Sequence, residues 1–302
     1  MITKTAMITI AGRPNVGKST LTNALVGEKI TIVSPKPQTT RRRILAVTSR
    51  GDTQFVFADT PGFHKARTKL GDYMDNVVRQ SVADVDAVAL LVEPIASIGP
   101  QERLLIERLR ENRMPAVLVV NKADTLADKR ELLPVMALYS EAYDFTDIVP
   151  ISAKTGDGVE ELLSVLAKFA VEGPQLFPDD IVSDQPEKQI CAEIVREKLL
   201  LCLDKEIPHG TAVVVTKFSQ RDDEGDEPGV IDMDVTIYCE KASHKGIIIG
   251  KHGAMLKKIG ELSRRDIEAF MGSKVFLQTW VKVKENWRDS DALLRNFGFS
   301  DE

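Results

Sequence analysis

The feature that most constrains this chain is a glycine-containing loop near its start. Residues 12–19 read Gly-Arg-Pro-Asn-Val-Gly-Lys-Ser and fit GxxxxGK[ST], between a short apolar run and a helical pattern. In that setting backbone N–H groups and a helix N-terminus surround a phosphate, and the lysine reaches its outer oxygens. The loop predicts a nucleoside triphosphate site. The expected phosphate-binding residues are Gly12, Arg13, Pro14, Asn15, Val16, Gly17, Lys18, Ser19 and Thr20.

A second motif indicates which base the nucleotide carries. Asn121, Lys122, Ala123 and Asp124 follow an apolar run. The Asp124 carboxylate can accept hydrogen bonds from N1–H and the 2-amino group of guanine, whereas adenine would leave that charge unpaired. We expect Asn121 to tie this segment to the phosphate loop, the stem of Lys122 to cover the base, and the Ala153 N–H to meet guanine O6. The predicted base-binding residues are Asn121, Lys122, Asp124, Ser152, Ala153 and Lys154.

A third motif, Asp-Thr-Pro-Gly at 59–62, follows an expected strand. Its aspartate can hold Mg²⁺ through water, and the N–H of its glycine can sense the γ-phosphate. One threonine of the earlier Gln38-Thr39-Thr40-Arg41 segment should complete the magnesium shell, and we favour Thr40 over Thr39. The expected metal ligands are Ser19, Thr40 and Asp59, the expected catalytic residues are Lys18, Thr40 and Gly62, and Asp59, Thr60, Pro61, Gly62 and Phe63 are expected to contact the nucleotide.

In this order the motifs resemble those of translation-factor-type GTPases over roughly the first 170 residues. Phe63 stands where the Ras-like pattern has a water-orienting glutamine, and it has no polar atom to orient a nucleophile. We therefore expect slow intrinsic turnover and acceleration by a partner, a metal ion or a reordered loop. Asn15 resembles the ligand for a monovalent cation in related GTPases, which suggests stimulation by K⁺. His64 is left outside the catalytic set.

Strand-like and helical patterns alternate through this first part of the chain. Such alternation predicts a mostly parallel sheet with helices on both faces. The expected strands cover 7–11, 44–49, 54–58, 87–92, 116–120 and 148–151, with a hairpin turn at Gly51-Asp52. A first helix is expected to begin at Lys18, and the other expected helices cover about 72–83, 100–112, 128–143 and 159–170.

Prolines and acidic residues then interrupt any helical period between Pro174 and Pro186, which indicates a linker. Beyond it we expect a helix at about 188–205, strands at 211–219 and 230–240, helices at about 244–250 and 254–271, and a strand at 274–284. The predicted organisation is a GTPase domain at 1–173, a linker at 174–187, a second domain at 188–286 and a tail at 287–302.

The second domain carries a GxxG loop, Gly250 to Gly253, between an apolar segment and an amphipathic helix. Glycines at both ends let the backbone approach a phosphodiester closely. Between Lys241 and Lys284 ten lysines and arginines face three acidic residues, which leaves +7 in a chain of net charge -5. A concentrated basic face beside such a loop indicates nucleic-acid binding, although a solvated lysine surface is the simpler alternative.

The order of elements around this loop resembles the KH fold in its bacterial, type II arrangement, which is α+β. Such modules clamp about four nucleotides of single strand. Ile247, Ile248 and Ile249 could form an apolar floor for the bases, with core packing an equal alternative. The resemblance implies that the RNA-binding residues are Gly250, Lys251, His252, Gly253, Lys257 and Lys258.

The whole chain, including Trp280-Val-Lys-Val-Lys-Glu-Asn-Trp-Arg-Asp near its end, resembles bacterial ribosome-assembly GTPases. That resemblance implies GTP and GDP as ligands, Mg²⁺, binding near the 3′ end of 16S ribosomal RNA, and a role in late assembly of the 30S subunit. It also implies a cytoplasmic protein with partial, peripheral association with the inner membrane. We expect a monomer.

Composition limits the other possibilities. The three cysteines are far apart and form no CxxC pair, so neither a zinc site nor a disulfide framework is indicated. No signal peptide and no run of about 18 apolar residues is visible. Two alternatives stay open: a membrane-linked signalling GTPase whose KH-like domain binds protein, and a passive RNA-binding protein in which the nucleotide is only structural.

Overall fold

The computed structural model describes residues 2–61, 68–80, 85–221 and 229–299. The chain folds as two compact units: Met1–Lys65 with Met74–Asp184, and Ala66–Tyr73 with Gln185–Glu302. None of the helices within the described ranges is long and apolar enough to cross a membrane.

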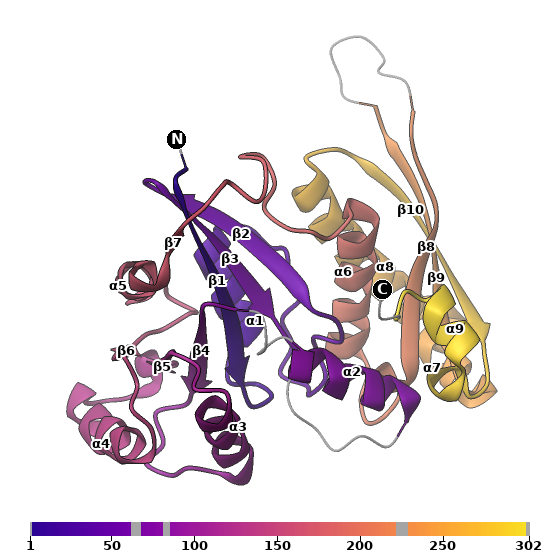
Figure 1. Ribbon diagram of the computed structural model, residues 1–302. Coiled ribbons are helices and arrows are strands. Elements are labelled where there is room, and N and C mark those ends of the chain that lie inside the picture. Colours follow the sequence, from indigo (N-terminus) through magenta and orange to yellow (C-terminus); the bar gives the residue numbers. More distant parts are fainter. Residues whose placement is uncertain (1, 62–67, 81–84, 222–228, 300–302) are drawn as a thin grey trace. The chain divides into compact units, whose positions relative to one another are not determined.

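The first unit is built around one mixed sheet with the strand order β2-β3-β1-β4-β5-β6 (Figure 1). Strands β3, β1, β4, β5 and β6 are parallel neighbours, whereas β2 pairs antiparallel with β3 and β7 pairs antiparallel with β1. The strands are β1 (Lys4–Gly12), β2 (Ile44–Arg50), β3 (Thr53–Asp59), β4 (Ala87–Val92), β5 (Ala116–Val120), β6 (Asp147–Pro150) and β7 (Val171–Glu172).

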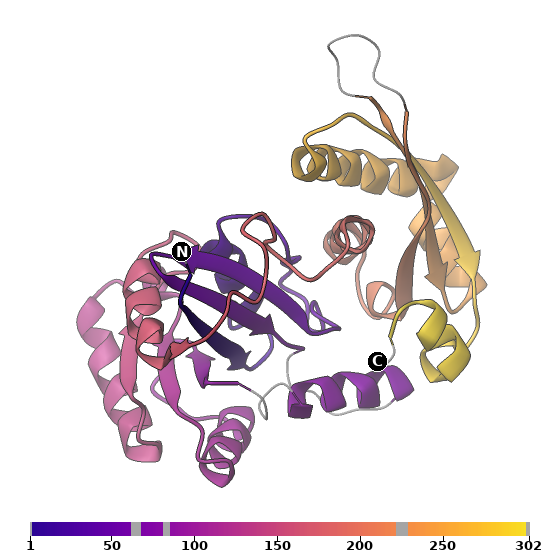
Figure 2. The same ribbon diagram turned by 45° about the horizontal axis from the view of Figure 1, so that its top comes forward.

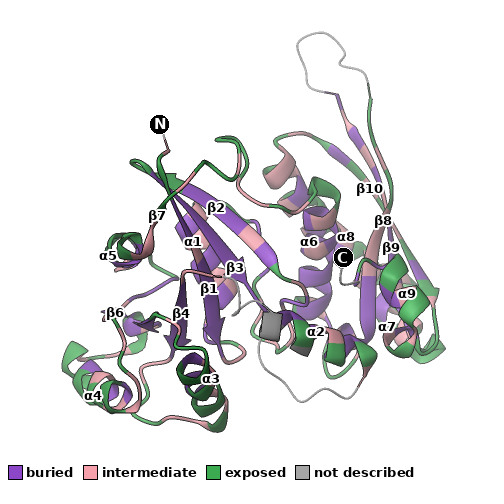
Figure 3. Ribbon diagram, viewed as in Figure 1, coloured by how far each residue is buried: buried purple, intermediate pink, exposed green. Residues whose placement is uncertain are grey.

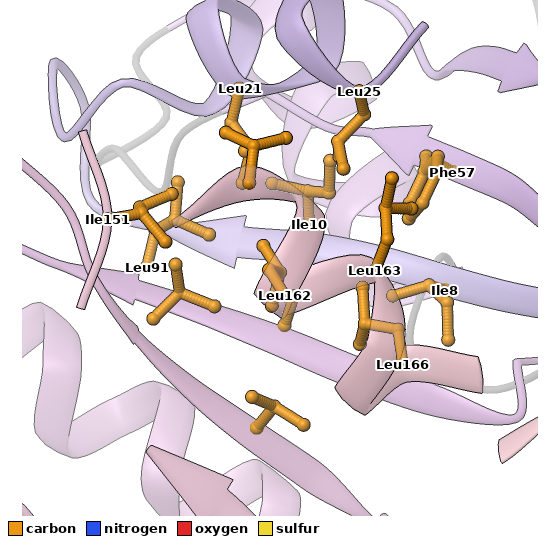
Figure 4. Close-up of a cluster of buried hydrophobic side chains, with 14 of the residues drawn as sticks. Ile8, Ile10, Leu21, Leu25, Phe57, Leu91, Ile151, Leu162, Leu163 and Leu166 are labelled. Atoms are coloured by element: carbon orange, nitrogen blue, oxygen red, sulfur yellow. The ribbon is translucent and has the colours of Figure 1, made fainter. Parts of the chain in front are cut away.

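Both faces of this sheet are covered, as the alternation of patterns predicts. Successive residues of a strand point to opposite faces, so β4 contributes Leu91 to one core and Leu90 to the other. Figure 4 shows the first core, where Ile8 and Ile10 of β1 pack with side chains of α1 and α5. The second core joins β4 and β5 to α3 and α4. The helices of this unit are α1 (Lys18–Val26), α3 (Pro100–Glu111), α4 (Leu132–Ala142) and α5 (Val159–Leu166). A further helix, α2 (Lys69–Gln80), is divided between the units, since residues 69–73 group with the second and residues 74–80 with the first.

Most of the expected elements of this unit are present, with shifted ends. The helix expected at 128–143 begins at Leu132, because Asp128 caps a separate short 3₁₀ turn over Lys129–Glu131. Part of the helix expected at 72–83 falls on residues 81–83, outside the described residues. The short edge strand β7 was not expected.

The segment interpreted as a linker lies along the edge of the first sheet. The Val47 N–H donates to Val182 O at 2.9 Å, and the Leu45 N–H donates to Asp184 Oδ1 at 2.9 Å. Near the start of the segment, the N–H groups of Leu176 and Phe177 donate to the side-chain carbonyl of the buried Gln54 of β3. The first two contacts satisfy backbone groups of the edge strand β2, and the Gln54 contacts satisfy backbone groups of the segment itself, so residues up to 184 group with the first unit.

The second unit is a three-stranded sheet with the order β10-β9-β8. Strands β9 and β10 are parallel, and β8 and β9 are antiparallel. Alternate residues of β9 are fully buried against α6, α7 and α8 on one face (Figures 2 and 3). The elements are α6 (Glu187–Cys202), β8 (Thr211–Gln220), β9 (Ile231–Cys239), α7 (Ala242–Ile249), α8 (Ala254–Met271) and β10 (Val275–Val283). This is the helix and strand order expected for a type II KH domain.

Residues 284–299, which follow β10, pack against the second unit, which sequence patterns did not indicate. Trp287 is fully buried, and its Nε1–H donates to Gly210 O at 3.0 Å. A short helix, α9 (Asp291–Asn296), follows, and the Ser290 hydroxyl caps it. Phe297 stacks on Tyr238 of β9 with ring centroids 4.7 Å apart. Aromatic packing therefore holds this segment to the second unit.

Candidate functional site

The phosphate loop joins β1 to α1 and has the geometry that its glycines allow. Gly17 has φ 103°, in the left-handed region, and a Cβ there would lie 2.3 Å from Asn121 Nδ2. At Gly12 a Cβ would lie 2.7 Å from Leu91 O. Asn15 also has a positive φ of 64°. The loop is thus held in one conformation by close neighbours, which tolerate only glycine at its ends.

Lys18 is the buried cation of this loop. Its Nζ donates to Gly12 O at 3.1 Å and to Arg13 O at 3.2 Å, so the ammonium group curls back over the loop. Burial lowers the pKa of Lys18 to about 8, and the nearby Asp59 carboxylate opposes that shift. An anion placed in the loop would restore the preference for the charged form.

Three oxygen-bearing side chains from separate segments meet beside Lys18. Ser19 Oγ lies 2.9 Å from Thr40 Oγ1 and 2.9 Å from Asp59 Oδ2, and Thr40 Oγ1 lies 3.3 Å from the same carboxylate oxygen. Thr39, the other threonine considered, instead donates its hydroxyl hydrogen to Lys36 O at 2.7 Å.

This oxygen triangle fits a hard divalent cation. Magnesium prefers oxygen ligands, and hydroxyl and carboxylate groups hold it in nucleotide sites. Burial raises the pKa of Asp59, whereas Lys18, Ser19 and Thr40 lower it. A divalent cation at the triangle would favour the ionised carboxylate.

Asn121 connects three loops of the site. Its Nδ2 donates to Val16 O at 2.8 Å, as expected for a tie to the phosphate loop. Its Oδ1 accepts from the Ala153 N–H at 2.9 Å. That N–H was expected to meet guanine O6, whereas in this structure it donates to a protein acceptor. The Lys122 ammonium donates to Asn15 O at 2.8 Å, and the Asp124 side chain is exposed.

A cavity of about 290 Å³ lies between the phosphate loop, the segment 32–40 and Lys122. Across it the Asn15 side-chain amide donates to Pro35 O at 2.8 Å. Among the predicted residues it is lined by Pro14, Asn15, Gly17, Lys18, Ser19, Thr20, Thr40 and Lys122.

Some predicted residues lie elsewhere. Gly62 and Phe63 fall outside the described residues. Ser152 accepts the Thr155 N–H through its hydroxyl at 3.2 Å, and Lys154 is exposed. Sequence reasoning missed Glu93, which ion-pairs with both Arg13 and Lys122. No motif marks it; only its place directly after a buried strand could have drawn attention to it.

In the second unit the GxxG loop separates α7 from α8. Gly250 has φ 74°, and a Cβ there would lie 2.7 Å from Met255 Cβ. Gly253 has φ 80° but no atom within 4 Å of an added Cβ. The two glycines therefore have different roles: the first allows tight packing, and the second leaves open space at the start of α8.

A groove of about 500 Å³ runs from this loop between α8 and β10. Of the six expected RNA-binding residues, Gly253 and Lys257 line it, while Gly250, Lys251, His252 and Lys258 do not. The question of the three isoleucines is also resolved. Ile248 is fully buried and Ile249 packs on the core, whereas Ile247 is 50% exposed. The groove is lined by Gly253, Leu256, Lys257, Gly260, Glu261, Arg264, Val275, Phe276, Leu277 and Thr279.

Each unit matches a known family model. The family model described as "50S ribosome-binding GTPase" matches residues 7–122, and the KH domain model matches residues 206–288. The chain is 48% identical over 296 residues to GTPase Era of Clostridium kluyveri (98% of this chain, 99% of the relative) and 48% identical over 299 residues to GTPase Era of Clostridioides difficile (99% of each).

Two solved structures are similar over nearly the whole chain. One is Era in complex with MgGDPNP and nucleotides 1506–1542 of 16S ribosomal RNA, and the other is an Aquifex aeolicus Era variant bound to GDP and AlF4⁻. Each has a TM-score of 0.93 and 34% sequence identity, and each alignment covers 99% of this chain and 100% of the other.

Proposed function

Because the chain belongs to the Era family of GTPases, we propose that it binds small-subunit ribosomal RNA through its KH domain and acts in 30S subunit assembly under the control of bound GTP. GTP hydrolysis itself follows from family membership. The observation that carries the proposal is the presence, in one chain, of the Ser19–Thr40–Asp59 triangle beside a buried lysine and of a groove, lined by Lys257 and Arg264, that opens from a GxxG loop.

We assign the nucleotide site as follows. Backbone N–H groups of Arg13 and of residues 15–18, together with the N-terminus of α1, would bind the β-phosphate, with Lys18 between the β and γ oxygens. Ser19 and Thr40 would hold Mg²⁺ directly, and Asp59 would hold it through water. When bound, the metal would neutralise charge that develops on the phosphate oxygens. Gly62 is assigned to the γ-phosphate by its motif alone.

Guanine selection is assigned to Asp124. Its exposed carboxylate is free to reach N1–H and the 2-amino group of a base that lies on the stem of Lys122. The Ala153 N–H would leave its bond to Asn121 Oδ1, or share it, to meet guanine O6. A wrong base would leave the carboxylate without a donor, which supports strong selection against adenine.

Potassium is proposed as an activator. The side-chain amide of Asn15 lies at the mouth of the phosphate cavity, and its carbonyl oxygen could bind a monovalent cation there. Phe63 offers no polar atom to orient water, so intrinsic turnover should be slow. Turnover measured in K⁺ and then in Na⁺ at fixed ionic strength tests this: equal rates would exclude the role.

The RNA assignment rests on the groove between α8 and β10. The start of α8 is left open at Gly253, Lys257 lines the groove at its side, and Ile247 offers an exposed apolar surface near the loop. Lys251, His252 and Lys258 would contact the phosphodiester backbone from the rim. Single-stranded RNA of about four nucleotides fits this class of module.

Filter binding tests the RNA partner directly. We expect an oligonucleotide from the 3′ end of 16S RNA to bind tightly, with an affinity that falls steeply as salt rises. A 23S fragment of equal length and composition is the control, because the matching family model is described by the large subunit. Equal binding of both RNAs would contradict the assignment.

The alternative of a protein-binding KH-like domain predicts no salt-dependent RNA affinity, so the same titration separates the two.

We also propose peripheral contact with the cytoplasmic membrane, supported by the basic segment Lys241–Lys284; each lysine near an anionic leaflet contributes about 1 kcal/mol. Vesicle flotation with and without anionic lipid tests that contact. We propose functional boundaries at 1–173, 174–187, 188–286 and 287–302 and a monomeric state; structurally, residues 174–184 group with the first unit and the described residues from 287 on with the second.

A further inference from the structure

The strand order of the first unit places one acidic residue between the two loops that would bind the nucleotide. Strand β4 lies between β1 and β5, with Gly12 opposite Leu91 and Val92 opposite Val120. The chain leaves β1 into the phosphate loop and leaves β5 into the Asn121–Asp124 segment. Glu93, the first residue after β4, therefore lies at the carboxyl edge of the sheet between these loops, where ligands of open parallel sheets bind.

The Glu93 carboxylate contacts a cation from each loop. Its Oε2 pairs with Arg13 Nη2 of the phosphate loop, and its Oε1 accepts a hydrogen bond from Lys122 Nζ. The side chain is only 21% exposed, so solvent screens these pairs less than it screens a surface pair. The neighbouring Asn121 N–H donates to Val92 O at 2.9 Å and fixes the two strand ends together.

From this geometry we infer that Glu93 is a positioning residue for guanine-nucleotide binding: it sets the lysine that covers the base and connects that lysine to the phosphate loop. Lys122 Nζ is held between Glu93 Oε1 and Asn15 O, so its aliphatic stem has one direction. Glu93 itself reaches neither phosphate nor base in this assignment. The inference rests on the proposed role of Lys122.

Arg13 and Lys122 bring two positive charges to the Glu93 carboxylate. Burial, followed by the positive charge of Arg13, lowers the pKa of Lys122, and Asp124 opposes the shift. Without Glu93 the two cations would face each other with no anion between them. Arg13 would still pair with Glu102, whose Oε1 lies 3.1 Å from Arg13 Nε, whereas Lys122 Nζ would keep its hydrogen bond to Asn15 O and the more distant charge of Asp124.

The test compares steady-state GTP hydrolysis and GDP affinity in the full-length protein and its variants. We expect Glu93→Gln to raise the KM for GTP and the Kd for GDP by about tenfold, because the negative charge that strengthens the Lys122 and Arg13 contacts is lost in ground state and transition state alike, while kcat stays unchanged. Glu93→Asp, which keeps the charge, should recover part of the loss. Glu102→Gln is the matched control, since it removes the other carboxylate beside Arg13 without touching Lys122; we expect its GDP affinity to stay within twofold of wild type.

A double-mutant cycle with Lys122→Met separates this inference from the proposed function. If Glu93 acts through Lys122, the combined variant should bind GDP about as weakly as Lys122→Met alone. The inference would be overturned, while the base assignment stands, if the losses of GDP affinity in the two single variants multiply in the combined variant. It would also be overturned if the GDP affinity of Glu93→Gln is within twofold of wild type. A Lys122→Met variant that binds GDP normally would overturn the base assignment itself. Thermal melts of each nucleotide-free variant identify any loss that comes from unfolding.

Discussion

The side-chain oxygen of Asn121 accepts a hydrogen bond from the Ala153 N–H at 2.9 Å. The same amide donates to Val16 O at 2.8 Å, so one side chain joins the phosphate loop to the loops that follow β5 and β6. Asn121 is 2% exposed, and water cannot readily replace either contact. Stability of the first unit and binding of the nucleotide should therefore depend on the same residue.

Asn121→Ala should both destabilise the first unit and weaken nucleotide binding. Each buried partner left without a hydrogen bond costs roughly 1–3 kcal/mol. Urea unfolding of the nucleotide-free protein measures that loss. Asn112→Ala is the control, because its amide makes only a solvent-exposed hydrogen bond to Arg108 O at the end of α3, and it should shift the midpoint much less. A normal midpoint for Asn121→Ala would mean that water satisfies both groups.

Asp124→Asn should change which purine is preferred. An amide in place of the carboxylate can donate to the 2-oxo group of xanthine but cannot accept both guanine hydrogens. We expect GTP affinity to fall at least about 100-fold and xanthosine triphosphate to bind better than GTP, as for other mismatched polar contacts. Asp144→Asn, also exposed, is the matched control. Unchanged GTP affinity in Asp124→Asn would remove the base assignment.

Nucleotide binding should take up protons in mildly alkaline solution. Burial lowers the pKa of Lys18 to about 8, so above that pH part of the free protein carries a neutral amine. A bound phosphate raises this pKa again, and the difference appears as proton uptake and as affinity that falls with rising pH. Calorimetry of GDP binding at pH 8.5 in buffers of different ionisation enthalpy measures the uptake. A binding enthalpy that is the same in all buffers would mean no proton uptake, and would show that Lys18 is already fully charged in the free protein.

Gly253→Asp should abolish RNA binding while GTP affinity stays normal. A Cβ at this position meets no atom within 4 Å, so the main effects are a carboxylate beside the groove and a strained φ of 80°. Gly272→Asp is a close control, because Gly272 has φ 64°, equally open surroundings and a place at the other end of α8. Equal RNA affinity in both variants would place the RNA elsewhere.

Trp287→Ala should destabilise the second unit by about 3–5 kcal/mol, the usual range for a fully buried large aromatic side chain. The indole also donates to Gly210 O, so Trp287→Phe should lose less but still leave that carbonyl unpaired. Thermal unfolding followed by far-UV circular dichroism measures the loss of stability in both variants. A melt unchanged in Trp287→Ala would mean that the segment after β10 adds nothing to the fold.

The strands and motifs of the first unit were predictable because their signals are local. Strand β4 was predicted with the same ends as observed, since a run of apolar residues buried on both faces has clear limits. The preference for Thr40 over Thr39 agrees with the position of Thr40 in the oxygen triangle. Helix ends were less accurate where a cap such as Asp128 divides one helical pattern into two elements.

The features that sequence did not indicate depend on contacts between distant residues. Residues 182–184 carry the acidic, proline-flanked composition of a linker, yet they satisfy the edge of β2. The position of Glu93 directly after a buried strand is visible in the sequence, but its place between the two nucleotide loops follows from the order β1-β4-β5. Trp287 lies in a segment of mixed charge, and its burial depends on Gly210, far away in sequence. No local pattern encodes these pairings.

Crosslinking of RNA to the protein in living cells, followed by sequencing of the attached RNA, tests the central claim most directly. We predict that reads from the wild-type protein concentrate at the 3′ end of 16S ribosomal RNA and that Gly253→Asp loses them. Reads spread evenly over ribosomal RNA, concentrated on 23S RNA, or unchanged in Gly253→Asp would contradict the account.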